Sequence, residues 1–590
     1  MKTKAITKYN VLLLIIIAVN LASIIYCFAV KKEGWHSDEV WSYGFANSFY
    51  KSQLYLDNDG KQTNLNEWVD SKVLNDYIEV SKGERFRFDS VYNNQIYDLS
   101  PPFHSMILHA ICSVFPDTFS WWYSFAINIA AFVVCMIFLY KTAKVLKDEK
   151  LGILCCLLYG VSLAARDTYV YLRMYAMCTA MTMVLLYNAC VYTMKENDGK
   201  FVNKNLVGIF VTSLLMFFTH YYMIPLVGIV TAGVCILFVC RKKIKKTLVY
   251  GGMQLLSLAL SFALFPSVIK IFLSHQDSVD ATVSAVRDYK LPAKLKVMAN
   301  FILYKLYGIK ISVFTDFIWL KATIFVIISL CIILLPLYIL LRDTAFVRRG
   351  KSNANNLFNK IIIWYKKLNK IYVILVVTIV AQTLIVALTS QVYNMGWDEG
   401  RYIMYLYPIV TIFITSCVYS ICAKIKTGKV CSIVLSILIA LVVAINIYYR
   451  SIDNRYYYPK NVVGKNLASV VDGKSCVFLS NSQWAVVYMT PVLRFSREYF
   501  QVSKENYEKY ENEFIEKNRN DVVVLIDVTD LNKKQDMKRY VENSDELVDE
   551  IEKKYKDMLD YYKKIYEADD IEKVSAENVF GRRIEAYVLE

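Results

Sequence analysis

The sequence has few charged residues for its length. Of its 590 residues, 20% are Asp, Glu, Lys or Arg and 56% are hydrophobic, and the mean hydropathy is +0.33. Soluble proteins carry roughly a quarter charged residues. The scarcity of charge therefore excludes most soluble enzymes, and apolar stretches of about 20 residues predict an integral membrane protein. The length exceeds the need of a helical bundle alone and predicts an additional soluble part.

Three further absences narrow the kinds of protein that this sequence could encode. No cysteine pair has the C-x-x-C spacing of a zinc site, and 13 of the 14 cysteines lie in apolar or membrane-adjacent segments, leaving only Cys476 in the polar C-terminal part. The exported part is therefore not stapled by disulfides. No Gly-rich phosphate loop is present in the C-terminal part. No small-residue cleavage site follows Ala29, so we expect the first apolar run to stay in the protein as a span.

Long hydrophobic runs dominate what is present. They predict an α-helical polytopic membrane protein with about eleven transmembrane helices. The expected spans are 9–30, 119–140, 151–165, 173–194, 205–219, 221–240, 247–273, 319–341, 371–390, 402–423 and 429–449.

The net charge of +16 suggests nucleic acid or anionic lipid as a partner, and its distribution decides between them. Alternate connections between spans hold 26 Lys and Arg against five acidic residues, a formal +21 that leaves −5 for the rest. Positive loops face the cytoplasm. We therefore expect a protein of the cytoplasmic membrane, in contact with anionic lipids and not with nucleic acid. Its N-terminus would be cytoplasmic, with residues 31–118, 274–318 and 450–590 outside.

Two domains are expected: residues 1–450 as the membrane domain, including the outer loop 31–118, and residues 451–590 as a small extracytoplasmic domain. The latter alternates β-rich runs at 476–479 and 522–526 with charged helical patterns, which predicts an α/β fold. It carries no evident catalytic cluster and is interpreted as a cap or acceptor-docking domain.

Ionisable residues are nearly absent from the middles of the spans, which argues against proton relays and ion-coupled transport. They gather instead at the outer ends of the helices. The residues singled out there are Asp38, Glu39, Asp167, Arg173, Tyr175, His220, Tyr221, Arg401 and Tyr402. Interfacial Tyr and snorkelling Arg are the ordinary alternative for any one of them.

The adjacent carboxylates Asp38 and Glu39 differ from the others. They follow the first span closely and have no basic neighbour within reach along a helix. Two adjacent carboxylates repel, so one could have the raised pKa of a general base, or both could hold a divalent metal ion. Whether the protein binds a divalent metal ion therefore stays open.

The segment after Asp98 reads Leu-Ser-Pro-Pro-Phe-His and leads into an apolar stretch, 105–115. Proline is tolerated in the first turn of a helix. We expect a short interfacial helix, either an ordinary anchor or one wall of a lipid-facing groove. His104 and His109 are expected to be packing residues.

At these residues the chain resembles the GT-C superfamily of membrane glycosyltransferases, in particular the protein O-mannosyltransferases, the aminoarabinose transferases and their bacterial cell-envelope relatives. The resemblance covers roughly residues 9–450. It is carried by the Asp38-Glu39 pair, the D-x-x-P-P-type segment at Asp98, the R-x-Y pattern at Arg173, the T-H-Y turn at His220, and the R-Y at Arg401.

The resemblance implies transfer of one sugar from a polyprenyl-phosphate donor to a glycan, lipid or protein acceptor, with inversion. Asp38 would take the acceptor proton, and Glu39 would orient the acceptor or help to bind a metal. Arg401 would bind the donor phosphate, because a guanidinium matches phosphate oxygens bidentately. The residues expected to assist in substrate binding are Arg173, Tyr175, His220, Tyr221, Tyr402, Asp167 and Asp98.

A transporter or flippase of lipid-linked saccharides is the rival interpretation, and it predicts a polar path across the bilayer with pseudo-repeated halves. The sequence shows neither feature. A non-catalytic scaffold acting through residues 450–590 would leave Asp38 replaceable without consequence.

Overall fold

The computed structural model describes residues 8–98, 100–194, 203–267, 269, 291–308, 370–389, 399–422, 428–516, 521–531, 533 and 544–590. The chain divides into two compact units. The helical unit comprises Met1–Tyr26, Leu99–His104 and Phe125–Asp453. The sheet unit comprises Cys27–Asp98, Ser105–Ser124 and Asn454–Glu590.

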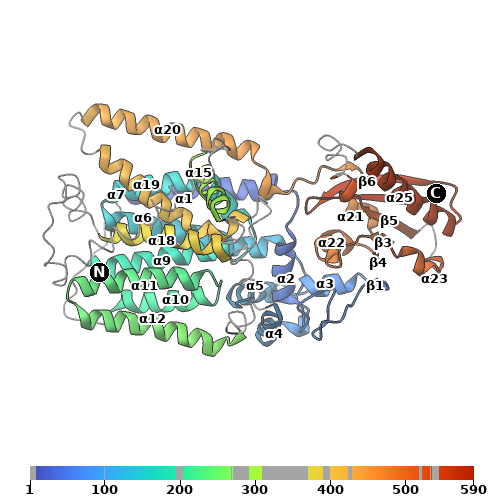
Figure 1. The fold of residues 1–590 in the computed structure, drawn as a ribbon, viewed down its shortest axis with the longest axis horizontal. Coiled ribbons are helices and arrows are strands. Elements are labelled where there is room, and N and C mark those ends of the chain that lie inside the picture. The colour runs from blue at the N-terminus through green and yellow to red at the C-terminus, as the bar shows by residue number, and fades with distance from the viewer. Residues whose placement is uncertain are drawn as a thin grey trace. The chain divides into compact units, whose positions relative to one another are not determined.

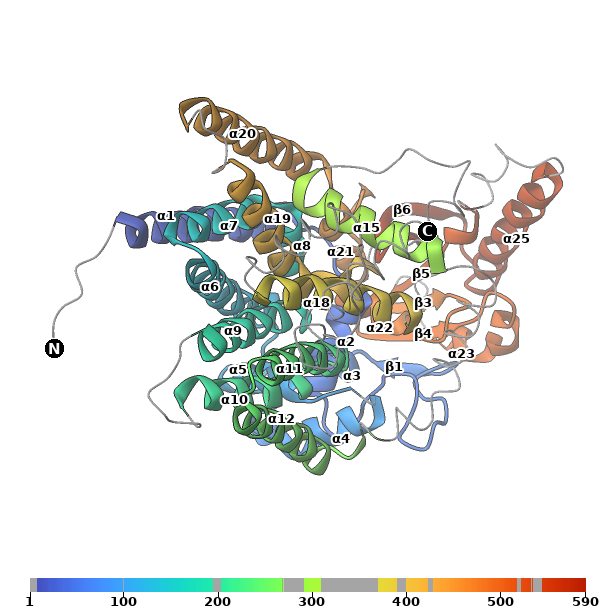
Figure 2. The same ribbon diagram turned by 60° about the vertical axis from the view of Figure 1, so that its left-hand side comes forward.

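The structure describes the following helices of the helical unit, most of which follow the predicted spans. They are α1 (Lys8–Tyr26), α6 (Trp121–Leu146, which begins in the sheet unit), α7 (Glu149–Val161), α8 (Leu163–Val170), α9 (Tyr175–Met194), α10 (Lys204–Phe217), α11 (Met223–Cys240), α12 (Ile244–Leu264), α15 (Leu291–Tyr307), α18 (Lys370–Thr389), α19 (Tyr407–Cys422) and α20 (Gly428–Ile452). Figures 1 and 2 both show α9, α10, α11 and α12 side by side.

Among the described residues, seven helices are long and apolar enough to cross a membrane. An eighth span is possible where α7 and α8 meet at a bend of 63°. Large apolar side chains on these helices, such as Leu14, Val239 and Leu255, face outward, as a bilayer requires. The chain is therefore a multi-pass membrane protein. The expected span at 319–341 lies outside the described residues, and the orientation of the bundle stays a prediction.

One helix, α15, lies within the segment 274–318 that we expected to be an outer loop. It packs against α8, α18 and α20, and two of its lysines, Lys294 and Lys305, are buried. A buried lysine needs a partner. Lys305, which interrupts the apolar stretch 301–307, is the sequence feature that could have indicated this helix.

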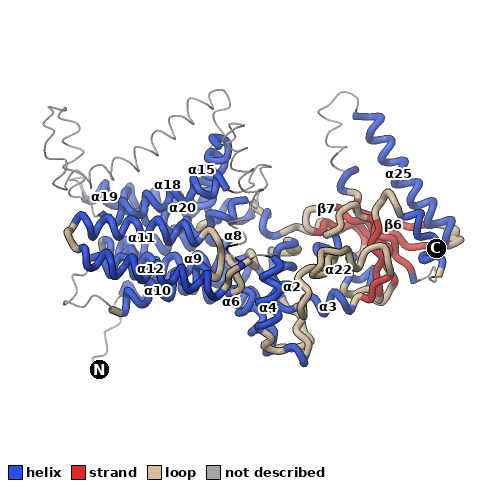
Figure 3. Tube along the Cα trace, turned by 60° about the horizontal axis from the view of Figure 1, so that its bottom comes forward, coloured by secondary structure: helices blue, strands red, loops and turns tan. Residues whose placement is uncertain are grey.

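The sheet unit contains seven strands: β1 (Trp68–Asp70), β2 (Val463–Gly464), β3 (Ser475–Leu479), β4 (Glu498–Val502), β5 (Val522–Asp527), β6 (Ile571–Val579) and β7 (Arg582–Leu589). They form one sheet in the order β1-β4-β3-β5-β7-β6-β2, drawn in red in Figure 3. Only the β3–β4 and β3–β5 pairs are parallel. The apolar runs at 476–479 and 522–526 became the fully buried strands β3 and β5, which confirms the predicted sheet.

In the described part of the sheet unit, nine helices accompany the sheet. They are α2 (Ser37–Asn47), α3 (Lys72–Ile78), α4 (Phe88–Asp98), α5 (Phe103–Val114, whose first two residues belong to the helical unit), α21 (Leu467–Val471), α22 (Ala485–Leu493), α23 (Glu511–Ile515) and α25 (Ser544–Ile565), with the π-helix η1 (Cys27–Lys31) directly after α1. The apolar face of α25 covers the sheet through Met558, Tyr562 and Tyr566. Short 3-10 turns, η2 (Lys82–Glu84), η4 (Arg455–Tyr457) and η5 (Tyr507–Tyr510), connect these elements.

The first outer segment is part of this sheet. Its strand β1 pairs with β4 in the register Trp68 to Phe500, and the Trp68 indole N–H donates to the Glu513 carbonyl at 2.9 Å. Arg494 in turn bonds Glu79 at 2.6 Å. The C-terminal segment therefore does not complete its sheet alone, because one edge strand comes from residues far earlier in the chain.

Candidate functional site

The N-terminus of α2 is built around a buried ion pair. Lys32 contacts Glu39, and neither side chain is exposed. The second oxygen of Glu39 accepts the His36 backbone N–H at 2.8 Å, which is half of a capping box. Burial lowers the pKa of Lys32, and the Glu39 carboxylate opposes that change. Glu39 thus fixes both the chain entering α2 and the first turn of the helix.

Asp38 stands in a different environment, although it is the neighbour of Glu39. Its side chain is 13% exposed and its carboxylate lies 3.5 Å from His36 Nδ1. That nitrogen accepts the Asp38 backbone N–H at 3.0 Å, so its lone pair is engaged and the contact with the carboxylate is not an ion pair. Asp38 therefore presents a partly exposed carboxylate in the first turn of α2.

A metal ion shared by Asp38 and Glu39 does not fit this arrangement. Both oxygens of Glu39 are occupied, one by the Lys32 ammonium and one by a backbone N–H. Within the described part of the chain, no three His, Cys, Asp or Glu side chains are grouped so that they could hold a metal. The basic neighbour that we judged absent is Lys32, seven residues before Glu39, which reaches it because the chain turns between them.

Asp98 is the last residue of α4 in the same unit. Its carboxylate is close enough to Tyr55 and Tyr77 to raise the pKa of both phenols, although burial is the larger cause. The prolines that follow lead into α5 at Phe103, so the predicted short helix is present. Substrate binding by Asp98 stays a prediction.

Arg401 lies in the 3-10 segment η3 (Glu399–Leu406), which leads into α19. Its guanidinium donates to the Tyr171 hydroxyl at 3.1 Å and to the Tyr402 hydroxyl at 3.2 Å. It also lies over the Tyr402 ring, 5.0 Å from its centre. Two phenols and one ring face therefore fix the plane of this cation.

His220 lies in the turn between α10 and α11, among aromatic rings. Its ring centre is 5.5 Å from that of Tyr175, 6.4 Å from that of Tyr402 and 6.5 Å from that of Tyr221. Its Nδ1 accepts the Tyr222 backbone N–H at 3.1 Å. Burial lowers the pKa of His220 to about 3, and the Arg173 and Arg401 cations contribute to that shift. His220 is therefore neutral at physiological pH.

We call this group the cation–tyrosine cluster; it consists of Tyr171, Arg173, Tyr175, His220, Tyr221, Tyr222, Arg401 and Tyr402. Six of the residues predicted from the sequence meet in it, contributed by three separate stretches of chain. Tyr171 and Tyr222 are additional members. Nothing in the sequence distinguished them from the other interfacial tyrosines.

Asp167 belongs to a separate buried cluster. It accepts from Arg166 Nε at 2.7 Å and contacts the Lys305 ammonium. Asp453 completes the cluster, because its carboxylate lies 3.2 Å from Arg166 and accepts the Tyr304 hydroxyl at 3.0 Å. With two cations against its carboxylate, Asp167 has a structural role that joins α8 to α15, and its expected contact with substrate stays a prediction.

Comparison with known proteins found no matching family model and no matching curated protein. Solved structures did match. The oligosaccharyltransferase AglB from Archaeoglobus fulgidus, in complex with an inhibitory peptide and a dolichol-phosphate, has a TM-score of 0.45 at 10% identity, covering 89% of this chain and 70% of its own. ArnT from Cupriavidus metallidurans, bound to undecaprenyl phosphate, has a TM-score of 0.35 at 9% identity, covering 97% of both chains.

The structural neighbours are GT-C superfamily membrane glycosyltransferases. The resemblance inferred from the sequence names the same superfamily. A third match, the A. fulgidus oligosaccharyltransferase in complex with Zn and sulfate, has a TM-score of 0.43 at 10% identity and covers 89% of this chain and 70% of its own. With TM-scores below 0.5, these neighbours do not decide the role of any residue here, and each role is assigned from the contacts of this chain.

Replacing Lys32 by Met should lower the free energy of unfolding of the full-length protein by roughly 3–5 kcal/mol, because it leaves the Glu39 carboxylate buried without its cation. The double variant Lys32→Met/Glu39→Gln should recover much of that loss. Thermal unfolding in detergent measures both. Lys82→Met, which breaks an exposed pair with Asp117, serves as the control and should cost under about 1 kcal/mol. Equal losses at the two sites would contradict the buried-pair assignment.

The lowered pKa of His220 predicts a pH-dependent stability. The unfolded chain binds a proton at this side chain as the pH falls through 6.5, whereas the folded chain does so only near 3. Stability from this group is therefore complete above about pH 7 and is lost as the pH falls from about 6.5 toward 3. His220→Gln should lose less thermal stability than the wild type between about pH 8 and pH 5. An identical loss in both proteins would show that His220 is not held neutral.

Proposed function

We propose that this protein transfers a sugar from a polyprenyl-phosphate donor to a hydroxyl acceptor of the cell envelope, at the outer face of the cytoplasmic membrane and with inversion at the anomeric carbon. The observation that carries the proposal is the cation–tyrosine cluster, in which Arg173 and Arg401 flank the neutral His220. Two guanidinium groups beside an uncharged imidazole make a site for an anion at the end of membrane helices.

The leaving group of such a transfer is a lipid phosphate. Negative charge grows on its oxygens as the bond to the anomeric carbon breaks, and oriented cations stabilise that charge. Arg401 is the residue we assign to this role, because the Tyr171 and Tyr402 hydroxyls hold its guanidinium in a fixed plane. A planar guanidinium that is already oriented loses little entropy when it bonds two phosphate oxygens.

The acceptor hydroxyl must lose a proton as its oxygen attacks the anomeric carbon. We assign the proton to Asp38, whose carboxylate is partly exposed at the N-terminus of α2. Glu39 is buried in its pair with Lys32 and is assigned a positioning role, because it holds the turn on which Asp38 stands. No divalent ion is assigned to this pair of carboxylates.

Replacing Asp38 by Asn should lower the rate of sugar transfer by roughly 100-fold or more, the usual contribution of a general base. Purified full-length protein is assayed with sugar-loaded undecaprenyl or dolichol phosphate, the lipid phosphates named for the two neighbours. Asp89→Asn is the matched control, since Asp89 is also an acid in the first turn of a helix of the same unit. It should transfer at the wild-type rate.

Transfer at the wild-type rate by the Asp38→Asn protein would remove Asp38 as the base. Movement of the donor lipid across the bilayer by the wild-type protein, without any sugar bound covalently to an acceptor, would favour the rival transporter interpretation.

Replacing Arg401 by Ala should raise the KM for the donor by roughly 10- to 100-fold, the worth of a charge-assisted hydrogen bond. The KM for the acceptor should change little. Arg401→Lys keeps the charge but not the planar fork, so it should fall between the wild type and the Ala variant. Steady-state kinetics with varied donor concentration measures the effect. An unchanged donor KM in the Ala variant would exclude Arg401 from the phosphate site.

A further inference from the structure

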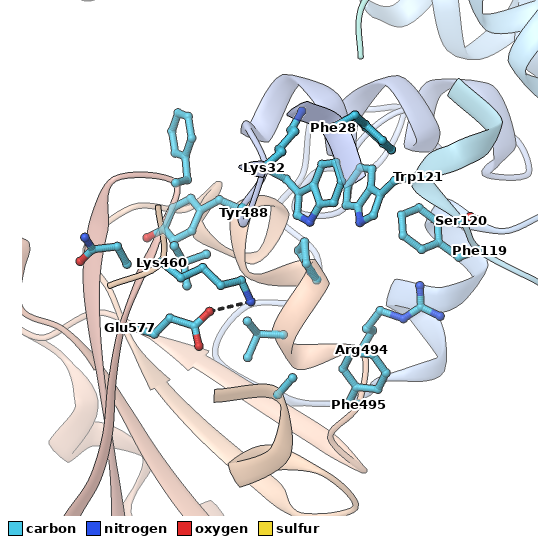
Figure 4. A pocket seen from close by; sticks show the side chains of 18 of the residues that line it. Phe28, Lys32, Phe119, Ser120, Trp121, Lys460, Tyr488, Arg494, Phe495 and Glu577 are labelled. Atoms are coloured by element: carbon cyan, nitrogen blue, oxygen red, sulfur yellow. Dashed lines mark ion pairs between the residues drawn. The ribbon is translucent and has the colours of Figure 1, made fainter. Parts of the chain in front are cut away.

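The sheet unit encloses a cavity of about 630 Å³ that the proposed reaction does not use. Residues from five short stretches of the unit line it: 28–35, 119–122, 460–468, 488–495 and 577–580. Asp38 is not among the lining residues. The volume lies within the range of sites for small molecules. Figure 4 shows the cavity with Trp121 and Phe119 on one wall and Tyr488 on another.

Aromatic side chains dominate the lining. Eight of the twenty lining residues are aromatic: Phe28, Trp35, Phe119, Trp121, Trp122, Tyr488, Phe495 and Phe580. Trp35 and Trp121 stack with ring centres 3.9 Å apart, and Phe28 meets Trp122 edge-on at 5.1 Å. These rings hold one another in place, so the wall exists before a ligand arrives. Rigid aromatic surface suits the flat C–H face of a sugar ring better than it suits a flexible acyl chain.

The polar groups of the cavity are already paired with opposite charges. Lys460 lies 2.8 Å from Glu577, and the pair is drawn as a dashed line in Figure 4. Arg494 bonds Glu79 at 2.6 Å, and Lys32 is paired with Glu39. Because each lining cation has a carboxylate beside it, the cavity offers donors and acceptors together and no surplus positive charge. Such a balance favours the hydroxyls of a neutral ligand over a phosphate.

The Lys460–Glu577 pair is the polar contact best placed for a ligand. Glu577 is 1% exposed, and its other oxygen accepts the Leu467 backbone N–H at 3.1 Å, which fixes the carboxylate. The Lys460 side chain is 30% exposed and carries three N–H donors. A fixed acceptor beside a reachable donor can bond neighbouring hydroxyls of one sugar.

Two parts of the lining adjoin membrane spans in the chain. Phe28 and Ala29 lie in η1, at the end of the candidate span Lys8–Lys31, and Trp121 and Trp122 are the first residues of α6. Tryptophan is enriched at the boundary between membrane and water. A sugar carried by a lipid anchor would reach a cavity at that boundary without a long linker.

We propose that this cavity binds the neutral sugar of a membrane-anchored glycan, with the apolar face of the sugar on the aromatic wall and its hydroxyls on the Lys460–Glu577 pair. The role of that glycan as the acceptor rests on the proposed function. Its binding does not, because binding requires no transfer.

Native mass spectrometry of the full-length protein, in a detergent without a sugar headgroup, tests the proposal. The probes are glucosyl diacylglycerol, diacylglycerol with the same acyl chains, and phosphatidylglycerol. We expect the glucosyl lipid to bind roughly tenfold more tightly than either of the others. Equal binding of all three would overturn the proposal, and so would preference for the anionic phosphatidylglycerol.

The double variant Trp122→Ala/Phe495→Ala removes two wall residues that are 48% and 46% exposed, so the fold loses little packing. It should bind the glucosyl lipid roughly tenfold more weakly. Phe86→Ala is the matched control, since Phe86 is 47% exposed in the same unit and does not line the cavity. Unchanged binding by the double variant would place the sugar elsewhere.

The Asp38→Asn protein separates the two proposals. It should bind the glucosyl lipid as the wild type does, since Asp38 does not line the cavity. If the wild-type protein binds the glucosyl lipid through Trp122 and Phe495 but transfers no sugar to any acceptor, the proposed function is refuted and the binding site stands. Sugar transfer by a wild-type protein that does not bind the glucosyl lipid in the cavity would refute the cavity proposal and leave the proposed function standing.

Discussion

The buried pair of Lys32 and Glu39 is the contact on which the start of the sheet unit depends. Two charges without exposed surface are stable only while they face each other, since either one alone would cost several kcal/mol. The pair therefore sets how far the chain turns between η1 and α2. The same contact orients the first turn of α2, which carries Asp38, and places Lys32 on the wall of the aromatic cavity. One ion pair thus links the proposed base with a second candidate site.

Asp38 and Glu39 show what a sequence can and cannot reveal. Adjacent carboxylates after a membrane span are easily found, and the pair could be singled out for chemistry from its spacing alone. Their division of roles depends on Lys32, which reaches Glu39 because the chain turns between the two residues. An irregular turn of this kind has no periodic sequence pattern from which it could be predicted. A search for partners along a helix misses it. Sequence reasoning found the pair, and only the fold separates the buried member from the partly exposed one.

Periodic and compositional signals predicted the membrane helices well, because a bilayer demands long apolar runs and tolerates few exceptions. Ten of the expected runs correspond to described helices, with ends that differ by a few residues. The cation–tyrosine cluster could be predicted in part, because the sequence places its members near the ends of spans that are expected to face the same side of the membrane. The pairing of β1 with β4 was not, since three residues of strand carry almost no pattern. The only sequence feature that could have indicated the ion cluster of Asp167 and Lys305 was a lysine within an apolar segment.

The strand β1 has a consequence for how the protein is made. Trp68 and its partner Glu513 are 445 residues apart in the chain, and most of the membrane helices are encoded between them. At about 5–20 residues per second, the ribosome needs roughly 20–90 s to reach that partner. Until β4 has been synthesised, β1 has no strand to pair with. This edge of the sheet unit therefore forms only after most of the helical unit has been made.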